Sequence, residues 1–306
     1  MRSIAGVVLV LLCLSARIFA LESAIQIPLL DRSAKAAATG EGGAFLSGLD
    51  ALGTNPAGLA GAPWTWNANY RSLPLDTSVN GLAFCFPVPS AHATVAFSYT
   101  SLRSAGLERR DTGGALQGEF RQEDQMVGLH VAGPLPLGDR EMDAGASVKS
   151  IHSRIDQYNG SGMAFDLGLR YRFQGIPLTL AAAALNVGEG PKLLNERSAL
   201  PTSYGVSASF PTGPVTVFGG TAYQPGQDIL NLSLGAETVI GHVLAFRGNY
   251  AGGTGAEGRT GWGQFVGGIG ISIGKLKLDY AFQPAGQDLA DAGAPATQHA
   301  TLTFIF

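Results

Sequence analysis

Charged residues are scarce in this sequence, and their scarcity excludes several classes of protein. Asp, Glu, Lys and Arg make up 14% of the 306 residues, whereas a typical soluble domain carries roughly 25%. The net charge is −3, so the chain lacks the basic excess with which nucleic-acid-binding proteins neutralise phosphates. The apolar share of 45% excludes a disordered chain, because disordered chains are rich in charge and poor in apolar residues. What remains is a folded chain whose outer surface need not face water.

Cysteine and long apolar runs are also scarce. Residues 1–20 are typical of a secretory signal peptide, with Arg2 near the start, an apolar run over 4–14 and the small residue Ala20 at the end. This run is shorter than the roughly 20 residues of a transmembrane helix. Cys13 would leave with the signal peptide, so Cys85 has no partner for an intramolecular disulfide. We expect an exported chain that, if it enters a membrane, does so as a β-barrel.

Alternation of apolar and polar residues dominates the chain from residue 63 onward. In 163–173, Met163, Phe165 and Leu167 share one strand face, while Asp166 and Arg170 share the other, because successive strand side chains point to opposite sides. A soluble sandwich and an outer-membrane barrel both produce this pattern. Strand length, strand number and loop asymmetry distinguish them.

The number and length of the alternating segments favour the barrel. Most are close to the 9–11 or so residues that cross a membrane, and longer than the roughly 5–6 of soluble strands. Their number is even, as in bacterial single-chain barrels, and short links mostly alternate with longer ones. The sequence therefore predicts an all-β fold, a transmembrane antiparallel β-barrel of about 14 strands over 63–306. The predicted strands are 64–71, 80–86, 92–101, 124–133, 142–152, 161–173, 177–187, 203–210, 214–223, 229–239, 242–251, 262–272, 274–283 and 297–306.

The segment 21–62 differs from the strands that follow. It is rich in alanine and turn residues, so we expect a short N-terminal plug inside the lumen. Asn55, Pro56, Ala57 and Gly58 form its clearest motif. Asn-Pro starts a chain reversal, and the alternative is an element that holds the plug against the wall. Small residues expected on the luminal face leave room for the plug; they are Gly145, Gly168, Gly235 and Gly268.

Charges on the predicted luminal faces are the other candidate site. One interpretation is a charged constriction that selects a solute; the other is an ion-pair network that fills the barrel and fixes the plug. We expect plug partners for them at Asp31, Arg32, Lys35, Glu41 and Asp50. The candidate luminal charges are Lys149, Asp166, Arg170, Arg172, Glu237, Arg247, Lys275, Lys277 and Asp279.

No catalytic, metal or cofactor motif stands out. The 5 histidines are on separate predicted strands, without the spacing of metal ligands, and no nucleophile elbow or phosphate loop is present. We therefore expect no enzyme and no cofactor. The charged segment 102–123 is predicted to be a solvated external loop, with a docking surface as the alternative.

The chain ends on an apolar strand face. Leu302, Phe304 and Phe306 share this face, and an aromatic end on the lipid side resembles the signal that the outer-membrane assembly machinery recognises. We therefore expect the bacterial outer membrane as the location, with its lipid and this machinery as partners.

Several segments in order resemble the PorV/PorQ family, relatives of FadL-type outer-membrane channels. They cover nearly the whole mature chain. They are Gly42-Gly43-Ala44-Phe45, Asn55-Pro56-Ala57-Gly58-Leu59-Ala60, Gly145-Ala146-Ser147-Val148-Lys149, Ala164-Phe165-Asp166-Leu167-Gly168-Leu169, Ala184-Leu185-Asn186-Val187-Gly188, Leu200-Pro201, Leu278-Asp279-Tyr280-Ala281-Phe282 and Thr301-Leu302-Thr303-Phe304-Ile305-Phe306. The resemblance implies a fourteen-stranded barrel with its N-terminal segment inside the lumen.

Two functional hypotheses follow from this resemblance. The first is a non-enzymatic, protein-handling role like that in type IX secretion, with secreted proteins as partners. The alternative is a FadL-like channel that carries a small hydrophobic solute and releases it through the barrel wall.

Overall fold

The computed structural model describes residues 26–30, 32–74, 76–136, 141–254, 260–284 and 295–306. The predicted signal peptide, 1–20, lies outside the described residues. Among the described residues, no helix is long and apolar enough to cross a membrane.

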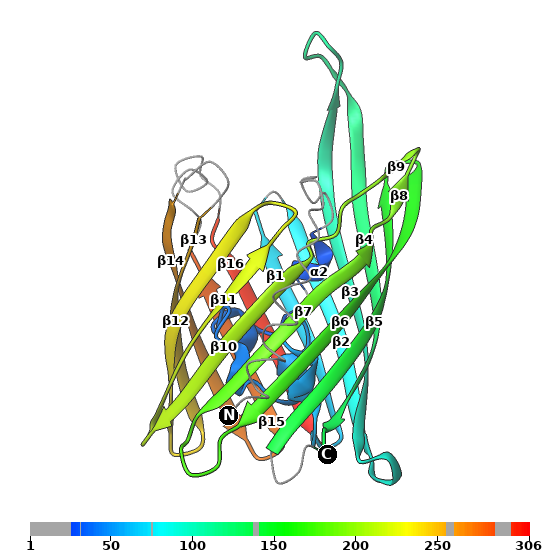
Figure 1. Cartoon of the computed structure of the whole chain (residues 1–306). Coiled ribbons are helices and arrows are strands. Elements are labelled where there is room, and N and C mark those ends of the chain that lie inside the picture. Colours follow the sequence, from blue (N-terminus) through cyan, green and yellow to red (C-terminus); the bar gives the residue numbers. More distant parts are fainter. Residues whose placement is uncertain (1–25, 31, 75, 137–140, 255–259, 285–294) are drawn as a thin grey trace.

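The strands form one closed antiparallel barrel (Figure 1). Each of the fourteen predicted strands overlaps one strand of this barrel, which confirms the predicted fold class. They are β1 (Thr65–Leu73), β2 (Thr77–Val88), β3 (Ala93–Arg110), β4 (Leu116–Pro134), β5 (Glu141–Ile155), β6 (Tyr158–Arg172), β7 (Thr179–Glu189), β10 (Ser203–Thr212), β11 (Val215–Gln224), β12 (Ile229–Ile240), β13 (Leu244–Thr254), β14 (Thr260–Ile273), β15 (Leu276–Gln283) and β16 (Thr297–Ile305).

The first and last strands close the barrel. β1 pairs with β16 from Thr65 opposite Ile305 to Ser72 opposite Gln298, and the backbone N–H of Phe306 donates to the carbonyl of Trp64 at 2.9 Å. Since lipid offers no hydrogen-bond partner, a membrane-spanning sheet needs this closure. A separate two-stranded sheet, β8 (Lys192–Leu193) and β9 (Glu196–Arg197), lies in the connection between β7 and β10.

The two faces of the wall follow the predicted alternation. On β6, Phe165 and Leu167 are 46% and 64% exposed on the outer face, whereas Asp166 between them is 2% exposed and points inward. Leu302 also lies on the outer face, and the rings of Phe304 and Phe306 meet edge to face at 5.0 Å. The role of these three residues in assembly stays a prediction.

The segment 102–123, expected to be a solvated external loop, is mostly exposed, but it is a hairpin of β3 and β4 rather than an irregular loop. β3 and β4 remain paired as far as Arg110 opposite Leu116, and the hairpin projects well beyond the barrel rim (Figure 1). Its tip is built by Asp111, whose Oδ1 accepts from the N–H groups of Gly113 and Ala115. Both faces of this ribbon meet water, so no apolar alternation marks it in the sequence.

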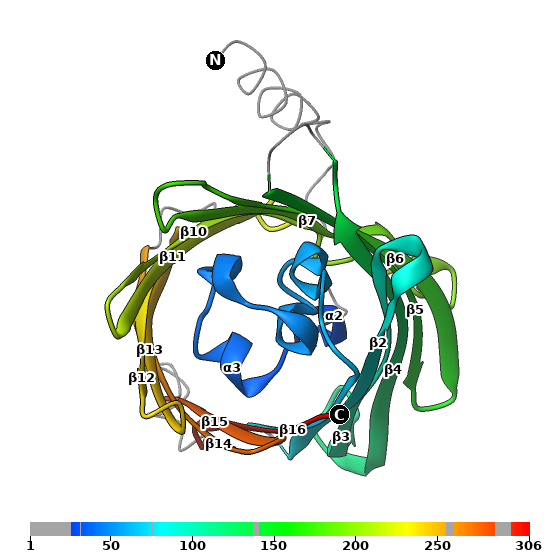
Figure 2. The same ribbon diagram turned by 90° about the horizontal axis from the view of Figure 1, so that it is seen from below.

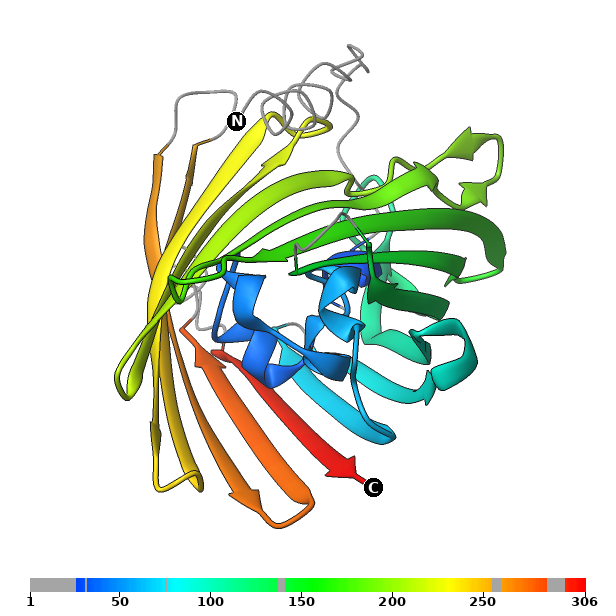
Figure 3. The ribbon, with the colours of Figure 1, turned by 60° about the horizontal axis from the view of Figure 1, so that its bottom comes forward.

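Short helices of the described part of the N-terminal segment lie inside the ring of strands (Figures 2 and 3). Ser33 caps α3 (Ala34–Ala37) by accepting a hydrogen bond from the N–H of Ala36. Gly40, with φ of +60°, turns the chain after this helix. The predicted start of this plug at residue 21 lies outside the described residues. The helices are α2 (Ile27–Leu30), α3 (Ala34–Ala37), η1 (Gly43–Phe45), η2 (Gly48–Ala51) and η3 (Pro56–Leu59).

A pair of equally exposed leucines tests the assignment of the outer face. Leu167 is 64% exposed on β6, and Leu194 is 68% exposed between β8 and β9. We expect Leu167→Arg to reduce the free energy of unfolding from vesicles by about 2–4 kcal/mol, because a cation near the bilayer midplane loses its hydration. Leu194→Arg should change it by less than about 0.5 kcal/mol.

Urea titration of vesicle-inserted protein, followed by the heat-dependent shift in gel migration, measures both effects. Equal effects of the two substitutions would mean that the β6 outer face does not meet lipid.

Candidate functional site: the plug and the luminal wall

The Asn55–Gly58 motif ties the plug to β6 and β7. Oδ1 of Asn55 accepts from the N–H of Ala57 at 2.9 Å and so caps η3. Its Nδ2 donates to the carbonyls of Leu169 and Ala182 at 3.0 and 3.2 Å. One side chain therefore shapes the turn and also holds it against the wall, and any further functional role of the motif stays a prediction.

Glycines on the wall make room for this contact. A Cβ atom at Gly145 or Gly168 would come closer than 3.0 Å to Pro56 or Asn55, a separation that real Cβ atoms do not tolerate. A Cβ atom at Gly268 would meet Ala38 at 2.7 Å in the same way. At Gly235 the neighbouring atoms belong to Phe218 and Gly248 of the wall itself, so that glycine accommodates a wall side chain rather than the plug.

Six buried or mostly buried charges join the plug to β12, β13 and β15, and we call them the charge network. Three are cationic and three anionic, so the group is formally neutral. Arg247 lies at its centre, where it contacts Glu237 and donates to Asp279 at 2.6 Å. The members are Lys35, Asp50, Glu237, Arg247, Lys277 and Asp279.

Two ion pairs of the charge network cross from plug to wall. Nζ of Lys35 lies 3.6 Å from Glu237, and Nζ of Lys277 lies 3.0 Å from Asp50. Burial disfavours the charged form of Asp50, but Lys277 and Lys35 outweigh burial and hold the pKa of Asp50 below its ordinary value. The stabilisation by ionised Asp50 is therefore present above the ordinary pKa and is lost as pH falls through the lowered one.

The plug charges Arg32 and Glu41, both predicted to pair with the wall, instead lie 3.7 Å from each other. The fifth predicted partner, Asp31, is outside the described residues.

A second group of predicted charges surrounds Asp143 of β5. Arg170 and Arg172 both donate to Oδ2 of Asp143, at 2.9 and 2.7 Å. Nη1 of Arg170 also donates to the carbonyl of Leu46 in the plug at 3.0 Å. Asp143 was not predicted from the sequence because it stands at the end of a predicted strand, and only strand register brings it opposite Arg170.

A third group joins β5, β6 and β7. Lys149 and Asp166 are each 2% exposed in their side chains and form an ion pair of 2.8 Å. Asn186, which was not among the predicted luminal site residues, contacts Lys149 and donates its backbone N–H to Asp166 at 2.8 Å. It has φ of +56° and lies where the pairing of β6 with β7 shifts, between Phe165 and Leu167.

Lys275 does not belong to the luminal charges. It lies exposed in the turn between β14 and β15, where Gly274 has φ of +59°. The predicted strand 274–283 begins instead at Leu276, so the alternation was extended by one residue pair too far. The expectation that Lys275 faces the lumen was therefore wrong.

The lumen beside α2 is apolar rather than charged. Inward-facing residues of β2 to β6 and one residue of the β7–β10 connection pack around Ile27, which is fully buried. We call this group the Ile27 cluster, and Leu30 and Leu73 pack against it. Its members are Ile27, Val79, Leu102, Met126, Ile151, Ala164 and Leu200.

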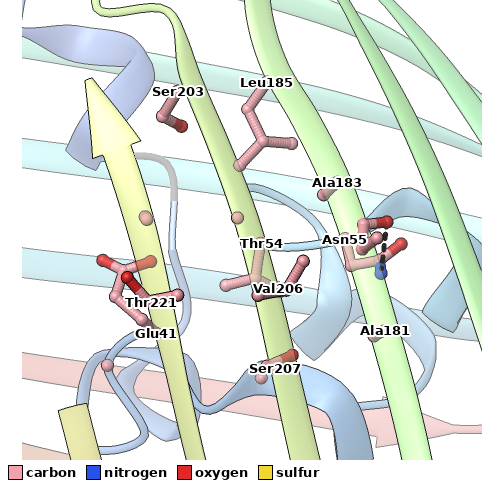
Figure 4. A pocket seen from close by; sticks show the side chains of 15 residues that line it. Glu41, Thr54, Asn55, Ala181, Ala183, Leu185, Ser203, Val206, Ser207 and Thr221 are labelled. Atoms are coloured by element: carbon pink, nitrogen blue, oxygen red, sulfur yellow. Dashed lines mark hydrogen bonds between the residues drawn. The ribbon is translucent and has the colours of Figure 1, made fainter. Parts of the chain in front are cut away.

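A cavity separates the plug from β7, β10 and β11 (Figure 4). Together with the open space at its mouth it contains about 380 Å³. Small residues such as Ala181 and Gly205 line the wall side, and Glu41, Thr54 and Asn55 line the plug side. The small side chains of this stretch of wall leave space that a larger residue would fill.

Comparison with known proteins gives fold similarity only. No family model and no curated protein matches the sequence. The toluene transporter TbuX of Ralstonia pickettii is 14% identical with a TM-score of 0.61, covering 90% of this chain and 98% of that one. A TodX monoaromatic hydrocarbon channel mutant is 13% identical with a TM-score of 0.57, covering 90% and 97%.

A FadL homologue of Pseudomonas aeruginosa is 11% identical with a TM-score of 0.55, covering 94% of this chain and 99% of that one. Nothing in these comparisons supports the PorV/PorQ resemblance, which stays a prediction. The shared fold, together with the apolar outer face, assigns the chain to the bacterial outer membrane.

A glycine pair tests the contact of the motif with the wall. Gly168→Ala would push Asn55 off the wall at a cost of about 1–3 kcal/mol for overpacking. We expect planar bilayers containing this variant to carry larger and noisier currents than wild type, because the plug is loosened. Gly267→Ala is the control, since its Cβ would meet nothing closer than 3.4 Å. Wild-type currents through the Gly168→Ala variant would show that the contact does not hold the plug.

Removing Lys277 tests the charge network. Lys277→Met leaves Asp50 without its closest cation, and breaking such a buried pair costs about 3–5 kcal/mol. We expect trypsin to cut after Lys35 at lower urea concentration than in wild type, because the plug leaves the lumen more easily. Arg103→Gln, which breaks an exposed pair with Glu123, should change the threshold, that is, the urea concentration at which trypsin cuts after Lys35, only slightly. An unchanged threshold in Lys277→Met would contradict a network that fixes the plug.

Proposed function

We propose that this protein is a non-enzymatic outer-membrane channel for small hydrophobic compounds. The observation that carries the proposal is the Ile27 cluster, an apolar group inside a barrel. Barrels that pass water-soluble solutes have polar interiors. Here Val79, Met126 and Ile151 point inward and are at most 4% exposed, so this part of the lumen offers a solute the apolar surroundings that water does not.

The plug itself covers these side chains. Ile27 of α2 packs against the wall members of the Ile27 cluster, and Leu30 packs against the cluster as well. The helix α2 has only 4 residues and is too short to be stable on its own. Movement of α2 would therefore expose the cluster without disturbing η3, which Asn55 fastens to the wall. We infer that α2 occupies the place where a hydrophobic solute binds.

The cavity beside β7 and β10 supports a route onward from this place. Most of the wall residues that line it are small. The pairing of β7 with β6 shifts at Asn186, where the sheet is locally irregular. We propose that a solute leaves the lumen through this stretch of wall into lipid. The proteins with similar folds are described as a toluene transporter and a monoaromatic hydrocarbon channel. These descriptions agree with the proposal that the solute is small and hydrophobic.

The protein-handling hypothesis has weaker support. The projecting hairpin is the candidate docking surface for a protein, but several of its charges already pair locally. Arg103 pairs with Glu123, and Arg110 pairs with Glu108 at 2.6 Å. Recovery of a stoichiometric secreted partner with the barrel from outer membranes would favour this hypothesis over the channel.

Two methionines test the channel proposal. Met126→Gln places an amide in the Ile27 cluster at nearly the same volume, and we expect it to weaken toluene binding about tenfold, because about 1.4 kcal/mol of apolar contact is lost. Met163→Gln, on the lipid face at 49% exposure, should bind as wild type does. Equilibrium dialysis of nanodisc-embedded protein against empty nanodiscs measures both.

Uptake by cells tests the same proposal without a substitution. Deletion of the gene should slow the entry of toluene and similar compounds. Unchanged uptake across a broad panel of hydrophobic compounds would reject the channel.

A further inference from the structure

The outer face of β3 to β6 changes character toward the end of the barrel from which the hairpin projects. Strand register places the outward-facing residues of these four strands in rows. The first two rows are mostly apolar, the third is polar and the fourth is mostly charged. In this order the rows are Phe97, Leu129, Val148 and Phe165; Tyr99, Val127, Ser150 and Met163; Ser101, Gln125, His152 and Ser161; and Arg103, Glu123, Arg154 and Asn159.

The polar and charged rows lie at the depth of the outer-leaflet head groups. Successive rows are about 7 Å apart along tilted strands, and head groups extend roughly 5–8 Å beyond the hydrocarbon on each side. The hairpin marks the external end, because the long connections of outer-membrane barrels are external, and the C-terminus lies at the opposite end (Figure 1). In the charged row β3 and β4 still pair with β2 and β5, since Arg103 lies opposite Ser78 and Glu123 lies opposite Arg154. The row therefore continues the lipid-facing wall.

The charged row and its nearest neighbour carry more cations than anions. Arg103 donates through Nε and Nη2 to Oε1 of Glu123 at 3.2 and 3.1 Å, yet its side chain remains 66% exposed. Arg154, on the other side of Glu123, donates its Nε to a neutral acceptor, the carbonyl of Asp156, at 3.2 Å. Arg121, two residues from Glu123 on β4, is exposed on the same face. We call Arg103, Arg121, Arg154 and Glu123 the basic patch, in which three cations accompany one anion.

The hairpin beyond the basic patch has the opposite balance of charge. Arg109 contacts Asp156, and Arg110 pairs with Glu108 at 2.6 Å. Two cations and four anions lie in this outer part; they are Glu108, Arg109, Arg110, Asp111, Glu119 and Asp156. Positive charge is therefore concentrated next to the membrane and negative charge away from it, which is the polarity that suits an anionic leaflet.

The order of the rows restricts which anionic lipid fits. The planar fork of arginine binds phosphate through paired hydrogen bonds. The backbones of β3 and β5 are about 10 Å apart across β4, so Arg103 and Arg154 can approach phosphate groups from two sides. The row below them offers polar groups such as His152 and Ser161, which contact each other at 3.1 Å and suit sugar hydroxyls. Lipopolysaccharide, the glycolipid of the bacterial outer leaflet, presents acyl chains, sugar and phosphate in this same order, whereas a phospholipid has no sugar layer.

We propose that the outer face of β3 to β6 binds lipopolysaccharide, with Arg103 and Arg154 holding its phosphate groups beside the barrel. Its acyl chains lie along the rows of Phe97 and Tyr99, and its sugar faces the row of His152. This surface is outside the barrel, so binding there does not depend on the proposed channel. The bound lipid fixes the depth of these four strands and the height of the hairpin above the leaflet.

Two matched double variants test the basic patch. Native mass spectrometry of the full-length barrel in detergent would measure binding of purified lipopolysaccharide, its dephosphorylated form and phosphatidylglycerol. We expect the double variant Arg103→Gln, Arg154→Gln to weaken lipopolysaccharide binding about tenfold or more, as the loss of charge-assisted hydrogen bonds predicts. The control Arg109→Gln, Arg110→Gln removes the same charge from the outer hairpin and should bind as wild type does. Glu123→Gln, which removes the competing anion, should bind more tightly.

Several results would overturn the proposal. Unchanged binding by the Arg103→Gln, Arg154→Gln variant, or equal losses in the two double variants, would show that the basic patch does not recognise the lipid. Equal binding of the dephosphorylated form would reject phosphate recognition, and equal binding of phosphatidylglycerol would reject lipopolysaccharide as the specific occupant. If the double variant lacks heat-dependent gel migration, Arg154→Gln alone replaces it, and unchanged binding by that variant would be equally contradictory.

Discussion

The structure depends on one constraint, that backbone polar groups in lipid must find partners within the protein. Pairing of β1 with β16 meets this constraint by closing the sheet, and closure divides every strand into a lipid face and a luminal face. The two faces then obey opposite rules. Outward side chains such as Leu167 are apolar because lipid surrounds them, while inward charges such as Asp166 need partners because little water reaches them. The scarcity of charge in the sequence follows from the first rule, and the pairing of the luminal charges follows from the second.

The plug contacts the luminal side chains of the wall in two different ways. Near β12 to β15, the charge network neutralises wall cations and anions together with Lys35 and Asp50. Near β2 to β6, Ile27 packs against apolar wall residues instead. The polar contacts of Asn55 hold the later part of the plug, whereas α2 is held mainly by apolar contacts, which a hydrophobic solute can replace at little cost. This difference makes α2 the natural mobile element of the proposed channel.

Most of the wall could be predicted from the sequence, because alternation is local and is imposed by lipid. The strands, the faces of β6 and the inward direction of Lys149, Arg170 and Glu237 all follow from it. The hairpin beyond the rim could not be predicted, because both of its faces meet water and its sequence therefore lacks the alternation of apolar and polar residues. The Ile27 cluster was missed for another reason, since Ile27 reaches its partners only through the path of the plug.

Photo-labelling shows whether the Ile27 cluster binds hydrophobic solutes. A toluene-sized diazirine probe is applied to the protein in nanodiscs, and labelled residues are mapped by mass spectrometry with and without excess toluene. We expect labelling at Ile27, Met126 and Ile151 that toluene suppresses, beside unsuppressed labelling at lipid-facing residues such as Phe165. Labelling confined to lipid-facing residues, with no suppressible component in the lumen, would contradict such binding.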